Sequence, residues 1–287
     1  MTMAEEQENI VEKNNDEVNT LVKPNYLEMT IQSDILPLEM RYSQINGCYS
    51  KRPLAYRSFT YINSVIEGVI PPERYMYAAD ETDRGRRLSV WNISQAIKTV
   101  QEFEEAGKMV DFVTARVSPS VVRESDFYSF VKNIFRDNDF TGYDKICFEF
   151  PRTVLFEDKE QVRLALINLK LLKIKSMISG CGEKDNPVTL LMTLPFDYVV
   201  LAPWLVPLSD DRVKRTSFES FLAFLTSTGC KIIADGVRND SQIQVLSRND
   251  CYGYIPSEKY EGSVKHGELR MTFEDAKLQG NEEDFDG

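Results

Sequence analysis

Four charged side chains lie on predicted strands or just after their ends, where they could bind a metal ion or an anion. Glu149 and Asp235 offer the carboxylate oxygens that Mg²⁺ prefers, and a bound dication can activate water for hydrolysis. Arg57 and Arg116 carry a positive charge that they keep at any ordinary pH. Other predicted strand ends carry residues without an anionic oxygen: Ser179, Gly180 and Ala202. The pattern indicates a strand-end pocket that lacks most of the groups needed for metal-assisted hydrolysis.

The histidine and cysteine content narrows the possible chemistry further. The single histidine, His266, lies in the predicted tail, which excludes a Ser–His–Asp triad, a Cys–His pair in a core pocket and a histidine-rich metal site. The five cysteines are widely separated and odd in number. This usage is typical of reduced thiols in a cytoplasmic protein rather than of a disulfide framework.

The elements that would position these residues alternate between strands and amphipathic helices. Apolar residues at helical spacing, such as Ile93, Ile97 and Val100, predict the helices, and Pro71–Pro72 predicts the start of a helix that runs to about Thr82. The predicted strands span residues 36–45, 54–62, 110–117, 146–150, 174–178, 196–201, 231–234 and 251–255. About eight strands in an α/β domain of this size favour a closed barrel, with function at the carboxyl ends of the strands. A doubly wound sheet is the alternative, although no glycine-rich phosphate loop follows the first strand.

The formal charge of −11 is concentrated at the two ends of the chain. We predict a flexible acidic leader over residues 1–30, a barrel over 31–262 and an acidic, disordered tail over 263–287, since such ends have too little apolar surface to fold. The negative charge disfavours nucleic acid as a partner. The apolar stretch 188–208 is interrupted by Asp197 and three prolines, so it is interpreted as a buried strand with loops and not as a membrane segment.

Several short motifs follow one another in an order that matches a known family. Residues 71–82, PPERYMYAADET, follow the pattern Pro-Pro-x-x-Phe-Ile-Pro-Leu-Ala-Glu-Glu-Thr. Residues 194–197 follow Leu-Pro-Val-Asp, residues 234–237 follow Ala-Glu-Gly-Val, and residues 250–254 follow a terminal Gln-Gly-Tyr segment. In this order, over residues 34–262, the chain resembles the EAL domains, which are bacterial cyclic di-GMP phosphodiesterases. The resemblance implies a modified TIM (β/α)8-type barrel with one antiparallel strand.

The resemblance also implies which residues replace those that bind metal in the family. The glutamate of the Glu-Ala-Leu signature falls on Arg57, and the metal-binding asparagine of the third strand falls on Arg116. The glutamate of the fourth strand remains as Glu149, and the glutamate of Ala-Glu-Gly-Val becomes Asp235.

Further family positions have lost their functional groups. The Asp-Asp pair becomes Ser179-Gly180, and Lys-Ile-Asp becomes residues 200–202, which end in Ala202. The phosphate-binding arginine downstream of the signature falls on Tyr61, and the final glutamine falls on Tyr252. With two carboxylates left for a six-oxygen site, we predict no metal, no other cofactor and no catalytic residue.

Glu149 leads to a more specific hypothesis. A buried carboxylate without a partner costs several kcal/mol, so we expect Arg57 or Arg116 to pair with it in place of a metal ion. The alternative is that the pocket binds a nucleotide or phosphate through these arginines. The residues of this degenerate pocket are Arg57, Tyr61, Arg116, Glu149, Ser179, Gly180, Ala202, Asp235 and Tyr252.

Three functions are compatible with this sequence. We predict a non-catalytic signalling or regulatory protein that binds another protein, such as a transcription or motility regulator, with self-association as a further possibility. The alternative is a receptor that binds cyclic di-GMP or another nucleotide without cleaving it, and Tyr61 disfavours this because receptors of the family usually keep the phosphate-binding arginine. An active phosphodiesterase ranks last, because Glu149 and Asp235 alone would have to support it.

Overall fold

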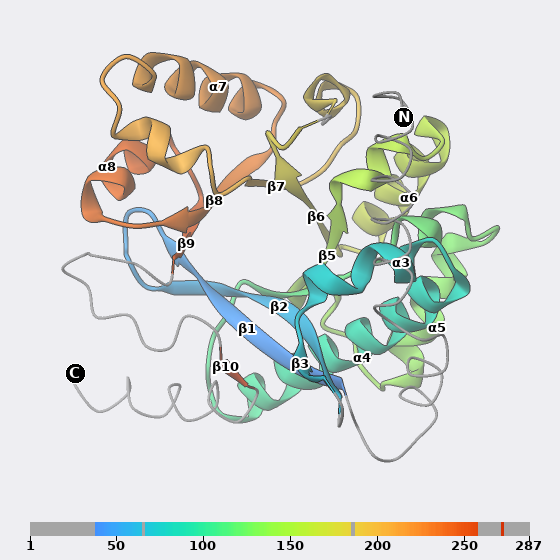
Figure 1. The fold of residues 1–287 in the computed structure, drawn as a ribbon. Coiled ribbons are helices and arrows are strands. Elements are labelled where there is room, and N and C mark those ends of the chain that lie inside the picture. Colours follow the sequence, from blue (N-terminus) through green and yellow to red (C-terminus); the bar gives the residue numbers. More distant parts are fainter. Residues whose placement is uncertain (1–37, 65–66, 185–186, 258–270, 273–287) are drawn as a thin grey trace, which may run out of the picture.

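Eight strands close into a barrel in the computed structural model, which describes residues 38–64, 67–184, 187–257 and 271–272 (Figure 1). The strands follow one another around the barrel in the order β1, β2, β4, β5, β6, β7, β8 and β9, and β9 pairs with β1 to complete the circle. Short strands β3 and β10 extend the sheet beside β2 and β1. Closure excludes the doubly wound sheet, which has two open edges.

The strands and helices have the following bounds in chain order. They are β1 Leu38–Gly47, β2 Pro53–Ser64, β3 Gly68–Ile70, α3 Met76–Asp80, α4 Asp83–Glu105, β4 Phe112–Arg116, α5 Phe127–Asp137, β5 Ile146–Pro151, α6 Lys159–Leu171, β6 Lys175–Cys181, β7 Tyr198–Leu201, α7 Arg215–Ser227, β8 Lys231–Val237, α8 Asp240–Arg248, β9 Gly253–Pro256 and β10 Met271–Thr272.

Strand β1 is the antiparallel member of the barrel. It joins β2 through a tight turn in which the Gly47 N–H donates to the Arg52 carbonyl at 2.9 Å, and Lys51 takes a positive φ of 56°. β1 runs antiparallel to both β2 and β9, while the other barrel strands pair in parallel. The predicted fold, a modified (β/α)8-type barrel with one antiparallel strand, is therefore confirmed.

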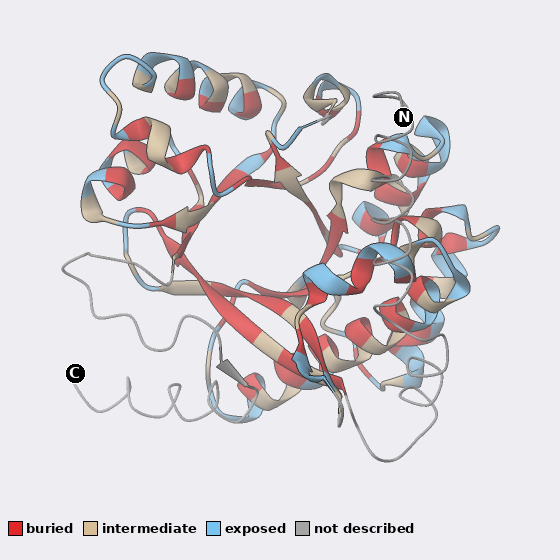
Figure 2. Cartoon of the chain, viewed as in Figure 1, coloured by how far each residue is buried: buried red, intermediate tan, exposed pale blue. Residues whose placement is uncertain are grey.

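The helices form an outer layer, and burial follows the two faces of each element (Figure 2). The predicted apolar face of α4 packs on the strands, with Ile93, Ile97 and Val100 fully buried. A separate cluster fills the inside of the barrel: Ile45, Ala55, Phe112, Cys147, Met177, Tyr198, Val200, Ile233 and Ile255. Because neighbouring residues of a strand face opposite sides, this cluster identifies which positions point inward.

Two expectations needed correction at the level of single elements. The helix predicted from Pro71–Pro72 to Thr82 is instead a short 3-10 turn, Pro72–Arg74, followed by α3. The two are separate because Tyr75, between them, leaves helical geometry with a φ of −133°. The buried Tyr75 hydroxyl donates to the Thr60 carbonyl at 2.8 Å. Helix α8 was not predicted.

Within the described residues no helix is long and apolar enough to cross a membrane. The apolar stretch 188–208 contains strand β7 between two 3-10 turns.

Candidate functional site at the carboxyl end of the barrel

Three charged side chains project into the barrel just above its apolar filling. Arg57 follows the inward-facing Ala55 by two residues on β2. In the same way, Glu149 follows the inward-facing Cys147 by two residues on β5, and Asp235 follows the inward-facing Ile233 by two residues on β8. Side chains on a strand alternate with a period of two, so all three point inward, on the side of the apolar filling where β5 and β8 end. We call Arg57, Glu149 and Asp235 the mouth triad.

The mouth triad is held together by charged hydrogen bonds. Arg57 donates to Glu149 from Nη2 at 2.6 Å and from Nε at 3.0 Å to each carboxylate oxygen. Its Nη1 donates to an oxygen of Asp235 at 2.8 Å. Arg57 and Glu149 are 8% and 4% exposed, whereas the side chain of Asp235 is 25% exposed. The pairing expected between an arginine and Glu149 is present, and Arg57 provides it.

Electrostatics favour a permanently charged Arg57. Burial alone opposes the charged guanidinium and would lower the pKa of Arg57, but the adjacent carboxylates of Glu149 and Asp235 outweigh burial and raise the pKa. The guanidinium also lies 5.0 Å from the centre of the Phe59 ring, at cation–π distance. Arg57 is thus a fixed internal cation between two carboxylates.

Arg116 does not pair with Glu149, although it lies directly opposite Glu149 in the β4–β5 register. Its guanidinium forms a two-pronged ion pair with Asp80 at the end of α3, with distances of 3.1 Å and 2.5 Å. Of the two arginines expected as partners of Glu149, only Arg57 pairs with it, because the Asp80 carboxylate on α3 engages Arg116. Sequence reasoning missed the role of Asp80, although this residue lies within the PPERYMYAADET motif.

The strand-end positions Ser179, Gly180 and Ala202 offer few oxygens for a metal. The Ser179 hydroxyl donates to the Phe150 carbonyl at 3.3 Å, and Ala202 is buried with its N–H on the Cys181 carbonyl. Gly180 has a positive φ of 77°, a conformation that glycine adopts without strain. Beside it lies an ion pair that the sequence did not suggest, between Arg152 and Glu183 at 2.9 Å.

Two residues assigned to the pocket lie elsewhere. Tyr61 is buried on β2 beyond the mouth, and the Arg41 guanidinium lies 4.4 Å from its ring centre. Tyr252 precedes β9, so it stands at the amino-terminal end of the barrel, where its hydroxyl donates to Asp111 at 2.5 Å and its ring lies 5.1 Å from that of Tyr198. The placement of Tyr252 in the pocket is therefore wrong, because the motif match did not reveal which end of the strand the residue occupies.

The mouth triad does not fit a divalent metal ion. Glu149 and Asp235 are the carboxylates that reach the centre, and both accept hydrogen bonds from Arg57. A dication needs about six oxygen ligands and would stand next to a guanidinium that does not deprotonate. Among the residues that the structure describes, no group of three or more histidine, cysteine or acidic side chains is arranged to hold a metal. His266 lies outside the described residues.

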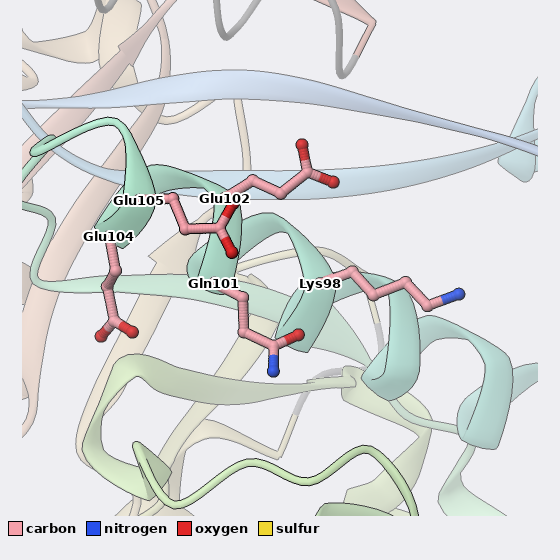
Figure 3. Close-up of a pocket in the computed structure, with 5 residues that line it drawn as sticks. All are labelled: Lys98, Gln101, Glu102, Glu104 and Glu105. Carbon is pink, nitrogen blue, oxygen red and sulfur yellow. The ribbon is translucent and has the colours of Figure 1, made fainter.

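A hollow beside α4 is separate from the mouth (Figure 3). It is lined by Lys98, Gln101, Glu102, Glu104 and Glu105, all from the carboxyl-terminal half of one helix. Side chains from a single helix surface do not converge on one point, so the mouth remains the candidate site.

The closed barrel with one antiparallel strand and an inward-facing charged mouth defines a TIM-barrel protein of the modified type. The sequence profile of the EAL domain matches residues 28–254, and the chain belongs to the EAL domain family. Among curated proteins it is 21% identical over 202 residues to uncharacterized proteins of Mycobacterium bovis and Mycobacterium tuberculosis. The alignments cover 69% of this chain and 32% of those relatives, so the chain spans about a third of their length.

Solved structures of EAL domains share the fold. The EAL enzyme Bd1971, in a form with cAMP and cyclic di-GMP bound, has a TM-score of 0.77 at 14% identity, covering 95% of this chain and 72% of that one. The FimX EAL domain from Pseudomonas aeruginosa, bound to c-di-GMP, has a TM-score of 0.70 at 13% identity, covering 85% of this chain and 95% of that one. At these identities the likeness establishes the architecture of the barrel.

Proposed function

We propose that this chain is a non-catalytic member of the EAL domain family. It regulates by binding another protein and does not hydrolyse cyclic di-GMP. The observation that carries the proposal is the position of the Arg57 guanidinium, 2.6 Å from Glu149 and 2.8 Å from Asp235. The carboxylates that could hold a dication are already hydrogen-bonded to a cation of the protein itself. The mouth triad is in this view a structural clamp that fastens β2 to β5 and β8.

The proposal has a clear physical basis in ligand chemistry. Metal-assisted hydrolysis requires a dication that lowers the pKa of a bound water, and the dication requires free carboxylates. Releasing Glu149 from Arg57 would leave a guanidinium buried without its main partner, which is strongly unfavourable. The mouth therefore resists conversion to a metal site by a simple change of rotamer.

Calorimetry with cyclic di-GMP, with and without Mg²⁺ or Mn²⁺, tests the proposal together with a chromatographic assay for the linear product. We expect neither heat of binding at micromolar ligand nor product, whereas an active EAL phosphodiesterase in the same buffers gives both. Micromolar binding without product would favour a nucleotide receptor instead. Product that depends on the metal would refute the proposal.

A further inference from the structure

Helix α6 carries apolar side chains on two opposite faces. Its inner face packs on the barrel through Val162, Ala165, Leu166 and Leu169. Leu164 and Leu171, however, are 53% and 70% exposed. At about 100° per residue these two leucines lie on the side of the helix opposite the inner face, and their spacing of seven residues places them roughly 10.5 Å apart on one line.

Ile167 completes this outer line. It is half-buried and lies between the two leucines, three residues after Leu164 and four before Leu171. This spacing is that of the seam positions in a helix that packs against another helix. The outer face of a surface helix is normally polar, so an apolar seam there indicates a contact with another molecule.

The charges beside the seam are predominantly basic. Arg163 and Lys170 each precede an exposed leucine, so both flank the seam on the same side. Arg163 also contacts Glu160 at 2.8 Å, one turn before the seam, while Lys170 is 3.9 Å from Asp197 and remains about half exposed. The opposite flank carries the neutral Asn168. Flanking charges of this kind select the charge of a partner helix.

We propose that this α6 seam, formed by Leu164, Ile167 and Leu171 with Arg163 and Lys170 beside it, binds an amphipathic helix of another protein whose apolar stripe is flanked by acidic residues. A second copy of this chain fits less well, because antiparallel α6 helices would bring the basic flanks of both copies together. The inference deepens the proposed function, on which it rests, by naming the surface and the chemistry of the partner.

Two synthetic helical peptides test the seam on the full chain. Both have about 28 residues, or four heptads, with the same isoleucine and leucine seam; one has glutamate at every flanking position and the other has lysine. We expect fluorescence anisotropy to detect micromolar binding of the acidic peptide alone. Leu171→Glu should weaken it at least about tenfold, because it replaces the more exposed leucine of the seam with a charge. Reversing both flanking charges, with Arg163→Glu and Lys170→Glu, should transfer the preference to the basic peptide.

Met109→Glu is the matched control, since Met109 is 90% exposed and lies outside α6. It introduces the same charge and should leave peptide binding unchanged, and circular dichroism verifies that all variants fold. Binding of neither peptide, or equal binding by the Leu171→Glu variant, would overturn the inference. So would seam-dependent binding to phosphatidylglycerol vesicles without peptide binding, or seam-dependent self-association in ultracentrifugation. These outcomes are independent of cyclic di-GMP turnover, which alone decides whether the chain is catalytic.

Discussion

Replacing Arg57 with methionine tests whether the mouth triad is a structural clamp. The change keeps a long side chain but removes every donor to Glu149 and Asp235. Removing one partner from a buried ion pair typically costs about 3–5 kcal/mol, because the remaining charge loses its compensation. Glu149, at 4% exposure, should account for most of this cost, since Asp235 is partly hydrated. For a domain of this size the loss corresponds to a fall in Tm of roughly 10 °C.

Urea unfolding at pH 7, followed by circular dichroism, measures this loss. Glu149→Gln in the Arg57→Met background should recover about 2 kcal/mol or more, because it removes the charge that the first substitution leaves without compensation. Asp235→Asn alone should cost only about 1 kcal/mol. A free energy of unfolding for Arg57→Met within about 0.5 kcal/mol of the wild type would refute the clamp, as would strictly additive losses in the double variant.

Three further predictions concern other parts of the barrel. Arg116→Leu should lower the free energy of unfolding by about 1–3 kcal/mol, because it removes the two-pronged ion pair with Asp80. Asp80→Asn weakens the same pair and should also lower the free energy of unfolding, and urea titration measures both variants. Gly236→Ala should lower the Tm more than Gly229→Ala does. Both glycines have a positive φ, but a Cβ at Gly236 would lie 2.9 Å from another side chain, while Gly229 has open space around it. Equal falls in Tm for the two variants would contradict this reasoning. Burial raises the pKa of the Cys48 thiol from 9.0 to about 12, so between these pH values the unfolded chain releases a proton that the folded protein keeps. The free energy of unfolding should therefore fall as the pH rises from 9 to 12, by about 1.4 kcal/mol per pH unit from this thiol. Cys48→Ala should make this fall less steep when urea titrations are repeated across the range.

The outward face of α6 illustrates why sequence patterns capture cores better than surfaces. The helical spacing of Val162, Leu166 and Leu169 coincides with the buried side of α6, because apolar residues repeated at helical spacing need a common core. Leu164 and Leu171 are equally apolar in the sequence. Their exposure depends on which helices and strands pack against α6, and this is a property of the tertiary structure.

The sequence by itself determined the alternation of strands and helices that makes the barrel, and which side chains near the mouth can carry a carboxylate. Alternating strands and helices leave few architectures that bury every apolar face, and Ser179 or Gly180 lacks a carboxylate in any conformation. The tertiary structure decided which cation meets Glu149. Arg116 is its direct neighbour in the β4–β5 register but pairs with Asp80 of α3, whereas Arg57, two strands away, reaches Glu149. Ion pairing depends on where side chains end in space, and closure of the barrel fixes those positions.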